Sequence, residues 1–377
     1  MKILQVLPAL EQGGVEWDAV ELALALKAQG VDSAVASAGG ALVAKLDAAG
    51  IVHHRLPLAT KNPLGILVNA WRLARLVRAG GYDLVHVRSR APAWSVRIAA
   101  AAARFPWLAT YHGVYGTKPA LFKLPYNRVM LKGLKTICVS DFVRRHVESV
   151  YRPPAGRLVT IRDGADTGRF HPGAVTAAAV AEFRRTLGFA DGVPLVVMVG
   201  RLTRWKGQHL LLEAVARMRT AAVGVLFVGS DQGRREYSAQ LREQARRLPS
   251  TRPVVFLERC ESMPLVYAAG AVAVNASSDQ PEAFGRVIPE AQAMGTLVIA
   301  TAHGGACETI IDGETGFLVP PGDVDALAAR LDAALAMEAA ARARMTAAAR
   351  RSVTEDFSVA ATCRATLAVY SELLRGR

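Results

Sequence analysis

Short runs rich in β-branched and apolar residues alternate with helical segments along the whole chain, and this alternation limits the possible folds more than any other feature. The runs before residue 162 are "KILQVL", "DSAVAS", "VHHRL", "DLVHV", "WLATYH", "TICVS" and "LVTI". After a break rich in Gly, Asp and Pro, "RDGADTGRFHPG", the pattern restarts with "PLVVMVG", "GVLFVG", "PVVFL", "VAVNA" and "LVIAT". Strands that alternate with helices indicate parallel sheets covered on both faces. The sequence therefore predicts an α/β protein of two doubly wound domains, residues 1–168 and 169–356, with a hinge near residues 163–175.

The length and composition agree with two Rossmann-like domains. The chain has 377 residues, of which 51% are hydrophobic, enough to fill two cores of ordinary size. The last stretch, about residues 357–377, predicts an amphipathic helix because apolar residues recur every four positions at Phe357, Ala361, Ala365, Val369 and Leu373. In open α/β sheets, ligands lie beyond the carboxyl ends of the strands, so functional residues are expected directly after them.

Several features favour a cytoplasmic location. The most apolar stretch, "AWSVRIAAAAARFPWLA", is interrupted by Arg97 and Arg104, and the N-terminal "MKILQVLPAL" lacks a cleavage site, so we interpret it as a first strand. The four cysteines are scattered without CxxC spacing, which suits a reducing compartment.

The net charge of +14 is concentrated in the first half of the chain. Residues 1–170 carry +12 and residues 171–377 only +2, so the first half is expected to face something acidic: nucleic acid, an anionic bilayer or a phosphorylated substrate. A merely solubilising surface is the alternative. Nucleic acid is not expected, because aromatic residues make up only 6% and the sequence lacks zinc-finger spacing or a recognisable base-reading motif.

Two strand ends carry features suited to phosphate. After "PLVVMVG" comes "RLTRWKG", which places Arg201, Arg204 and Lys206 at a strand-to-helix junction, although a solvated basic loop would look the same. Gly13 and Gly14 follow the first strand and allow a ligand close to the backbone, although tight turns also use such pairs. The sequence contains no GxGxxG and no GxxxxGK[ST], which counts against a dinucleotide oxidoreductase and a P-loop enzyme.

Further candidates are a histidine and two glutamates. His112 closes the strand "WLATYH" with Gly113 behind it, a position that favours function, although a lone histidine is often structural. In "PEAFGRVIPEAQAMG", Glu282 precedes a predicted helix, and Glu290 lies inside it, where it could accept hydrogen bonds from a ribose diol. The N–H groups of Phe284, Gly285, Arg286 and Val287 would form the free N-terminus of that helix. A helix cap plus a surface glutamate is the alternative.

Together these stretches resemble the family 4 glycosyltransferases of the GT-B fold, which are retaining enzymes that use nucleotide-activated sugars. The motifs that carry the resemblance occur in the right order over nearly the whole chain: "GGVE" at 13–16, "YHG" at 111–113, "GRLTRWKG" at 200–207, "PEAFGRVIPEAQAMG" at 281–295, "HGGACETI" at 303–310 and "GETGFLVPPGD" at 313–323. The resemblance implies two domains that face each other across a cleft, with the C-terminal helix returning to the first domain.

The resemblance also implies roles for these residues. The donor diphosphate would be held by Gly14, Arg201, Lys206, Phe284, Gly285, Arg286 and Val287, and the ribose by Glu290. Glu282 and His112 would be catalytic, and Gly13, Tyr111 and Gly113 would belong to the acceptor loops. No metal or other cofactor is expected, because no DxD-like carboxylate pair follows a predicted strand and Arg201 with Lys206 can supply the positive charge. The leaving diphosphate would help to deprotonate the acceptor, so no second carboxylate nucleophile is needed. The two glutamates would therefore not form a glycosidase pair.

The sequence departs from the family pattern at Trp17, Asp163 and Cys307, where relatives often have Arg, Asn and Pro. Cys307 and Asp163 lie near a ligand loop and the hinge, so these two departures bear on the donor preference. The sequence motifs most resemble those of enzymes that build bacterial lipopolysaccharide and related cell-surface glycans. An acidic or lipid-linked saccharide acceptor would suit the basic first domain.

Two stretches of the first domain suit contact with an anionic inner membrane. The segment 118–135 interleaves basic and apolar residues, and Arg72, Arg75 and Arg78 form a second basic stripe. An ordinary surface helix is the alternative. Rival functions are a sugar-nucleotide epimerase or phosphorylase of similar architecture, or an inactive glycosyltransferase-like subunit. The joint presence of His112 and the four donor-side residues argues against the inactive subunit.

Overall fold

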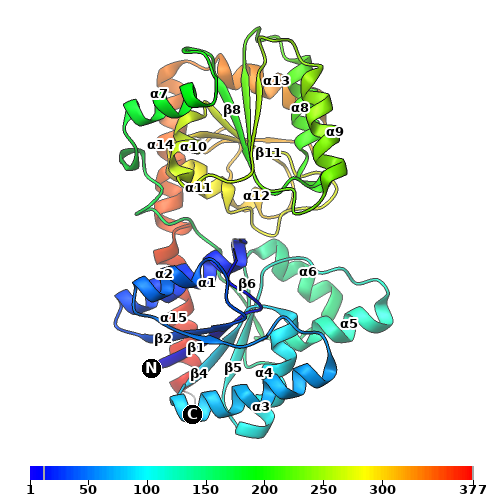
Figure 1. Ribbon diagram of the computed structural model, residues 1–377, viewed down its shortest axis with the longest axis vertical. Coiled ribbons are helices and arrows are strands. Elements are labelled where there is room, and N and C mark those ends of the chain that lie inside the picture. The colour runs from blue at the N-terminus through cyan, green and yellow to red at the C-terminus, as the bar shows by residue number, and fades with distance from the viewer. Residues whose placement is uncertain (12, 376–377) are drawn as a thin grey trace. The chain divides into compact units, whose positions relative to one another are not determined.

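The structure is a computed structural model that describes residues 1–11 and 13–375 (Figure 1). The chain divides into two compact units: unit 1 consists of Met1–Asp163 and Val359–Arg377, and unit 2 of Gly164–Ser358. The sequence placed the corresponding limits at residues 168 and 356. Figure 1 shows that each unit is a parallel sheet with helices on both faces.

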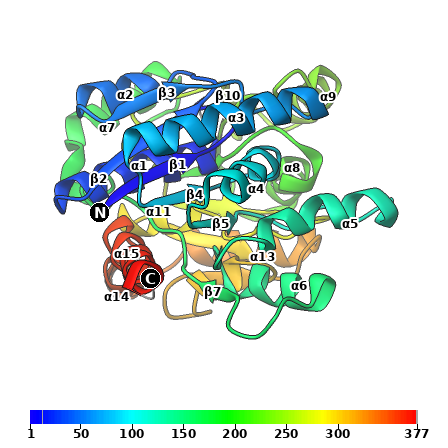
Figure 2. The same cartoon turned by 90° about the horizontal axis from the view of Figure 1, so that it is seen from below.

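Unit 1 contains a seven-stranded parallel sheet with the strand order β3-β2-β1-β4-β5-β6-β7. Its strands are β1 (Lys2–Val6), β2 (Asp32–Ser37), β3 (Val52–Arg55), β4 (Leu84–Val87), β5 (Trp107–Tyr111), β6 (Thr136–Cys138) and β7 (Leu158–Thr160). Its helices are α1 (Gly14–Ala28), α2 (Val43–Ala48), α3 (Pro63–Gly80), α4 (Arg90–Ala103), α5 (Ala120–Arg128), the 3₁₀ turn η1 (Val129–Leu131), α6 (Asp141–Tyr151) and α15 (Val359–Arg375). Figure 2 shows α3 and α4 lying side by side.

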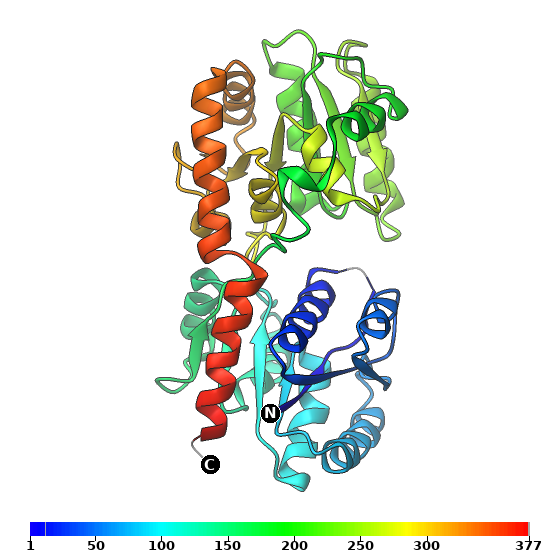
Figure 3. The same cartoon turned by 90° about the vertical axis from the view of Figure 1, so that its left-hand side faces the viewer.

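The C-terminal helix α15 belongs to unit 1, as predicted, and packs beside α1 against the sheet (Figure 3). The predicted apolar stripe of this helix is confirmed at Val369, which is buried, and at Leu373, which packs against the core, but not at Ala365, which is exposed. Phe357 precedes α15, and the side chains that α15 buries are Cys363, Thr366, Val369 and Tyr370. The alanines gave little periodic signal, whereas Tyr370 is fixed by a buried contact: its hydroxyl lies 2.6 Å from Nδ1 of His86 on β4.

Unit 2 contains a six-stranded parallel sheet with the strand order β10-β9-β8-β11-β12-β13. Its strands are β8 (Leu195–Val199), β9 (Gly224–Val228), β10 (Val254–Leu257), β11 (Val272–Asn275), β12 (Leu297–Thr301) and β13 (Phe317–Val319). Its helices are α7 (Ala177–Thr186), α8 (Gln208–Arg217), α9 (Arg235–Arg246), α10 (Met263–Ala269), α11 (Val287–Ala293), α12 (Ala306–Thr309), α13 (Val324–Leu335) and α14 (Ala339–Asp356), with 3₁₀ turns η2 (Pro172–Ala174) and η3 (Arg204–Lys206).

All twelve strands predicted from the sequence are present, and β13 is an additional one. It spans Phe317–Val319, between Gly316 and Pro320. Within the described part of the chain, we find no helix that is both long and apolar enough to cross a bilayer.

Each sheet has a point where the strand order reverses. In unit 1, β1 lies between β2 and β4, and in unit 2, β8 lies between β9 and β11. Ligands of open α/β sheets bind beyond the carboxyl ends of the strands at such points. The loops after β1 and β4, and those after β8 and β11, are therefore the places where functional side chains should gather.

Candidate active site

In unit 2, the loops after β8 and β11 are held against each other by a glycine. Gly207 has φ +82°, and a Cβ on it would lie 1.9 Å from the carbonyl oxygen of Ala276. Only glycine fits there, because other residues would meet both the steric clash and the left-handed conformation. Gly207 thereby brings η3, which carries Lys206, close to the end of β11.

Lys206 and Glu282, which are 76 residues apart in the chain, form an ion pair at this point. Their side chains are 14% and 11% exposed. The Glu282 Oε1 atom also accepts hydrogen bonds from Ser277 Oγ at 3.0 Å and from Asn275 Nδ2 at 3.4 Å. The structure thus brings together two residues that the sequence singled out separately.

The environment of Glu282 keeps its carboxylate charged. Burial acts to raise the pKa of Glu282, but the Lys206 ammonium and the hydrogen bonds from Lys206, Ser277 and Asn275 outweigh it, so the pKa lies below its ordinary value. At neutral pH the pair therefore consists of an ammonium and a carboxylate, directly at the end of β11.

Arg201 also lies in the loop after β8, but its side chain is exposed. Its guanidinium donates to Gln232 Oε1 at 3.4 Å, and its carbonyl accepts from Gln208 Nε2 at 2.9 Å, which fixes the loop backbone. Arg201 therefore presents a cation to solvent while Lys206 is paired.

Helix α11 begins at Val287, so the prediction that Phe284, Gly285 and Arg286 already belong to its first turn was wrong. Gly285 has φ +88°, which a right-handed helix cannot contain. Phe284 is buried and its ring lies 6.1 Å from that of Phe357, so only its backbone faces the loop.

The stretch "HGG" at 303–305 supports the Glu282 loop. The Gly305 N–H donates to the Glu282 carbonyl at 2.9 Å. A Cβ on Gly304 would lie 2.3 Å from that carbonyl oxygen, and one on Gly305 would lie 2.4 Å from the Cα of Phe284. These glycines allow a backbone-to-backbone approach that fixes the position of Glu282, which the sequence alone did not indicate.

Glu290 lies in the first turn of α11 and is not a surface residue, since its side chain is 16% exposed. Its Oε2 accepts from the Tyr267 hydroxyl at 2.9 Å, and its Oε1 lies 3.9 Å from Arg286 Nε. Burial raises the pKa of Glu290, and the attraction of Arg286, the Tyr267 hydrogen bond and the charge of Arg169 offset this only in part. The alternative of a surface glutamate is thereby excluded.

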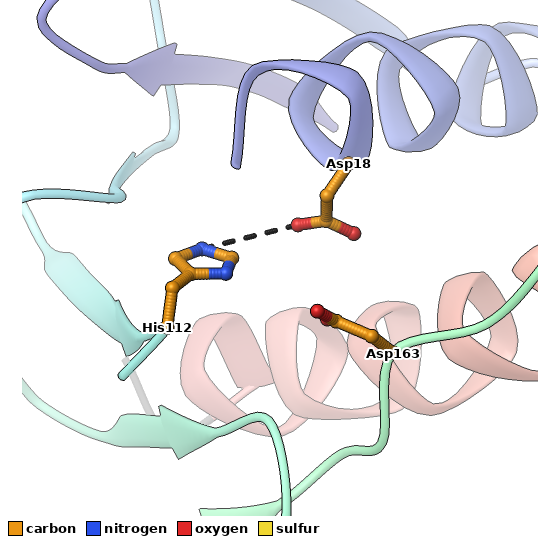
Figure 4. A group of neighbouring side chains, drawn as sticks. All are labelled: Asp18, His112 and Asp163. Atoms are coloured by element: carbon orange, nitrogen blue, oxygen red, sulfur yellow. Dashed lines mark ion pairs between the residues drawn. The ribbon is translucent and has the colours of Figure 1, made fainter. Parts of the chain in front are cut away.

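In unit 1, His112 follows β5 and faces two carboxylates (Figure 4). Its Nε2 atom lies 3.9 Å from Asp18 Oδ2, and the carboxylate of Asp163, below Asp18 in Figure 4, points toward the same group. Asp18 also forms an ion pair with Arg88, which directly follows β4 and donates from Nε to Gln5 Oε1 at 2.8 Å. The result is a buried chain of charged and polar groups at the strand-order reversal.

Asp18 and Arg88 were not predicted to be functional. Their positions carried a signal, because Asp18 stands four residues after the glycine pair and Arg88 is the first residue beyond β4. Gly13 caps the N-terminus of α1, and Gly14 is its first residue rather than preceding the helix. Gly113 is partly exposed beside His112.

Tyr111 is completely buried in unit 1. Its hydroxyl donates to the Asn127 carbonyl at 3.0 Å, and its ring packs against those of Tyr115 and Tyr151. Burial raises the pKa of Tyr111. Its side chain therefore supports the loop that carries His112. Because it is buried, this side chain cannot contact an acceptor.

Within residues 1–11 and 13–375, one group of side chains has the composition and spacing to hold a metal ion. It consists of Asp18, His112 and Asp163, whose ligand atoms lie within 4.8 Å of one another. The Arg88 guanidinium already balances the charge of Asp18. A cation bound at this point would have to compete with that guanidinium.

The chain is similar to known glycosyltransferases over both units. Residues 12–169 match Glycosyltransferase Family 4, and residues 180–352 match the Glycosyl transferases group 1. A crystal structure of a glycosyltransferase from Rickettsia africae ESF-5 is 35% identical, with a TM-score of 0.91, and the alignment covers 100% of this chain and 99% of that one. HepE from Anabaena, at 24% identity and a TM-score of 0.84–0.85, shares the fold.

Curated relatives match over shorter stretches. A D-inositol 3-phosphate glycosyltransferase of Corynebacterium urealyticum is 37% identical over 48% of this chain and 44% of its own length. A glycogen synthase of Mycobacterium tuberculosis is 32% identical over 64% of this chain and 54% of its own. The chain thus spans about half the length of these relatives. With the Rickettsia structure matched along its whole length, the chain belongs to the family 4 glycosyltransferases of the GT-B fold.

Proposed function

We propose that the protein transfers a sugar from a nucleoside-diphosphate sugar to a saccharide or lipid-linked acceptor with retention of the anomeric configuration. The observation that carries this proposal is the buried Lys206–Glu282 pair, which lies beside exposed Arg201 where the strand order of unit 2 reverses. Family membership supplies the reaction class, and this group supplies charges of the kind that a sugar diphosphate requires.

The donor would engage the residues of unit 2 by charge and hydrogen bonding. Arg201 and Lys206 would neutralise the diphosphate, assisted by the backbone from Phe284 to Val287. Glu290 would accept hydrogen bonds from the ribose hydroxyls, and Glu282 would face the transferred sugar. Because Lys206 is paired with Glu282, a bound phosphate would share the ammonium with that carboxylate, which couples the sugar end of the donor to its diphosphate.

In the reaction, the acceptor hydroxyl oxygen bonds to the anomeric carbon while the bond from that carbon to the phosphate oxygen breaks. The acceptor proton passes to an oxygen of the departing diphosphate. Lys206 and Arg201 stabilise the negative charge that develops there, and Glu282 stabilises positive charge on the sugar ring. Because these side chains stabilise the developing charges, the reaction requires no metal ion. We therefore still expect the protein to work without one.

In unit 1, His112 would orient the acceptor, held in place by Asp18 and, through Asp18, by Arg88. The acceptor is proposed to be part of lipopolysaccharide core or another cell-surface glycan, because the sequence motifs and the basic first half of the chain favour such an acceptor. Contact with the inner face of the cytoplasmic membrane would bring the enzyme to a lipid-linked acceptor.

The test is a transfer assay with UDP-glucose as the first donor, since HepE, which has the same fold, has been crystallised with UDP-glucose. Product formation with an α-configured linkage, detected by mass spectrometry and proton NMR, would support retention. In Glu282→Ala, we expect turnover to fall by at least about two orders of magnitude with the fold intact.

Other outcomes would favour a rival. Conversion of a donor without any acceptor would indicate an epimerase. A need for free phosphate would indicate a phosphorylase, and donor binding without turnover for every acceptor would indicate an inactive subunit. Normal turnover in Glu282→Ala would remove its assigned role.

A further inference from the structure

One part of unit 1 is almost devoid of acidic residues. Residues 48–140, here called the acid-poor segment, contain 14 basic residues and one acidic residue, Asp83. The carboxylate of Asp83 accepts a hydrogen bond from the Lys2 backbone N–H at 2.7 Å, at the edge where β4 begins. The acid-poor segment carries a net charge of +13, nearly the whole excess of the chain, and it builds α3, α4 and α5.

Most of the exposed large apolar side chains also lie in the acid-poor segment. Of the eleven such residues that are exposed in the described part of the chain, nine lie in the acid-poor segment and one, Ile311, in unit 2. Basic and apolar surfaces thus coincide in one segment. A surface made only for solubility would not expose this much apolar area.

The apolar residues are best organised on α3. Leu64, Leu67, Val68 and Trp71 are 72%, 53%, 47% and 59% exposed, and their spacing of three and four places them on one face over two turns. The opposite face, formed by Asn69, Ala70, Leu73 and Val77, is buried. The helix is therefore apolar on both sides near its N-terminus, although only one side packs against the protein.

Cations continue the exposed face toward the C-terminus of α3. Arg72, Arg75 and Arg78 are exposed, and the Arg75 guanidinium lies 4.7 Å from the centre of the Trp71 ring. A Trp and aliphatic side chains beside arginines, with no acidic residue on the helix, are the composition of a helix that lies in a membrane interface.

We propose that the exposed face of α3 docks the protein on an anionic lipid bilayer, with Leu64, Leu67 and Trp71 in the interface and the three arginines on lipid head groups. The apolar stripe favours a bilayer over nucleic acid, whose backbone offers it no apolar contact. The arginines disfavour a second copy of the chain, because symmetric pairing through α3 would bring like charges together. The inference rests on the proposed lipid-linked acceptor, for which it names the surface.

The test is co-sedimentation of the full chain with vesicles of phosphatidylcholine, alone or with about one third phosphatidylglycerol. We expect binding to the anionic vesicles only. Each cation at an anionic surface contributes about fivefold, so Arg72→Gln, Arg75→Gln and Arg78→Gln combined should weaken binding on the order of 100-fold. Leu64→Ser, Leu67→Ser and Trp71→Ser combined should weaken it at least about tenfold.

Matched controls lie in unit 2. Ile311→Ser removes an apolar side chain that is 55% exposed, and Arg235→Gln, Arg344→Gln and Arg351→Gln combined remove three exposed cations. Both variants should bind like the wild type. No binding of the wild type to anionic vesicles would overturn the proposal, as would full binding by the α3 apolar variant.

Two further results would also overturn it. One is loss of binding only when Leu121 and Phe122 of α5 are replaced, and the other is dimerisation or nucleic-acid binding that depends on α3. Because vesicle binding is measured without donor or acceptor, its failure leaves the transfer reaction untouched, and a failed transfer assay leaves the vesicle result standing.

Discussion

Replacing Lys206 with Met tests the buried pair in unit 2 most sharply. The Lys206→Met side chain fills a similar volume but leaves the Glu282 carboxylate, which is 11% exposed, with only Ser277 and Asn275 as partners. Breaking a fully buried pair costs about 3–5 kcal/mol. Because both side chains keep some solvent contact, we expect a loss of about 2–3 kcal/mol at neutral pH, or a fall in Tm of about 4–12 °C for a domain of this size.

The loss of stability in Lys206→Met should also depend on pH. In the wild type, the pKa of Glu282 lies below its ordinary value, so its contribution to stability is present at neutral pH and is lost as the pH falls through that pKa. Without Lys206, burial should raise the pKa of Glu282 above its ordinary value. The folded variant would then take up a proton before the unfolded chain does, so the stability deficit should shrink between about pH 7 and pH 5.

The assay is urea unfolding followed by pulsed hydrogen exchange and mass spectrometry, which assigns the transition to unit 2. Arg217→Met is the matched control, because Arg217 pairs with Asp325 at 2.8 Å but the two side chains are 50% and 80% exposed. An exposed pair of this kind contributes little to stability, so Arg217→Met should unfold at nearly the same urea concentration as the wild type. Equal losses in the two variants, or a Lys206→Met deficit that does not change with pH, would show that the buried ion pair does not stabilise unit 2.

Three further predictions concern single positions. Gly207→Ala should destabilise unit 2 by at least about 3 kcal/mol, because its Cβ would meet the Ala276 carbonyl, whereas Gly322→Ala, with φ +78° and open space, should cost only about 1 kcal/mol in urea unfolding. Glu290→Gln should raise Tm slightly at neutral pH, since burial raises the pKa of Glu290 and disfavours its charge, yet weaken nucleotide binding at least about tenfold by calorimetry; unchanged affinity would contradict a ribose role. Asp18→Asn should lower turnover at least about tenfold and alter its pH profile, while Asp32→Asn, at an exposed pair with Lys2, should change neither.

The sequence predicted the two sheets well because their buried strands are short apolar runs bounded by glycine and proline. It failed where a special backbone conformation or a contact between distant side chains decides the structure. The left-handed Gly285 delays the start of α11, and the Ala-rich α15 takes its buried face from the contact between Tyr370 and His86.

The ion pairs within the sites also could not be predicted from the sequence. Lys206 and Glu282 were each predicted for the donor, but their direct pairing depends on the close approach at Gly207. The Arg88–Asp18 pair joins residues 70 apart in the chain, and only the neighbouring positions of β1 and β4 bring it about. Such contacts follow from strand order, which local patterns do not specify.

The most direct test of the donor site is a thermal-shift panel of UDP, GDP, ADP, CMP and their common sugar conjugates, with and without EDTA, on the wild type and Lys206→Met. We expect one nucleoside diphosphate and its sugar conjugates to raise the Tm of the wild type, EDTA to leave the shift unchanged, and Lys206→Met to lose most of it. A shift that requires a metal ion, an equal shift in Lys206→Met, or no shift with any nucleotide would contradict this expectation.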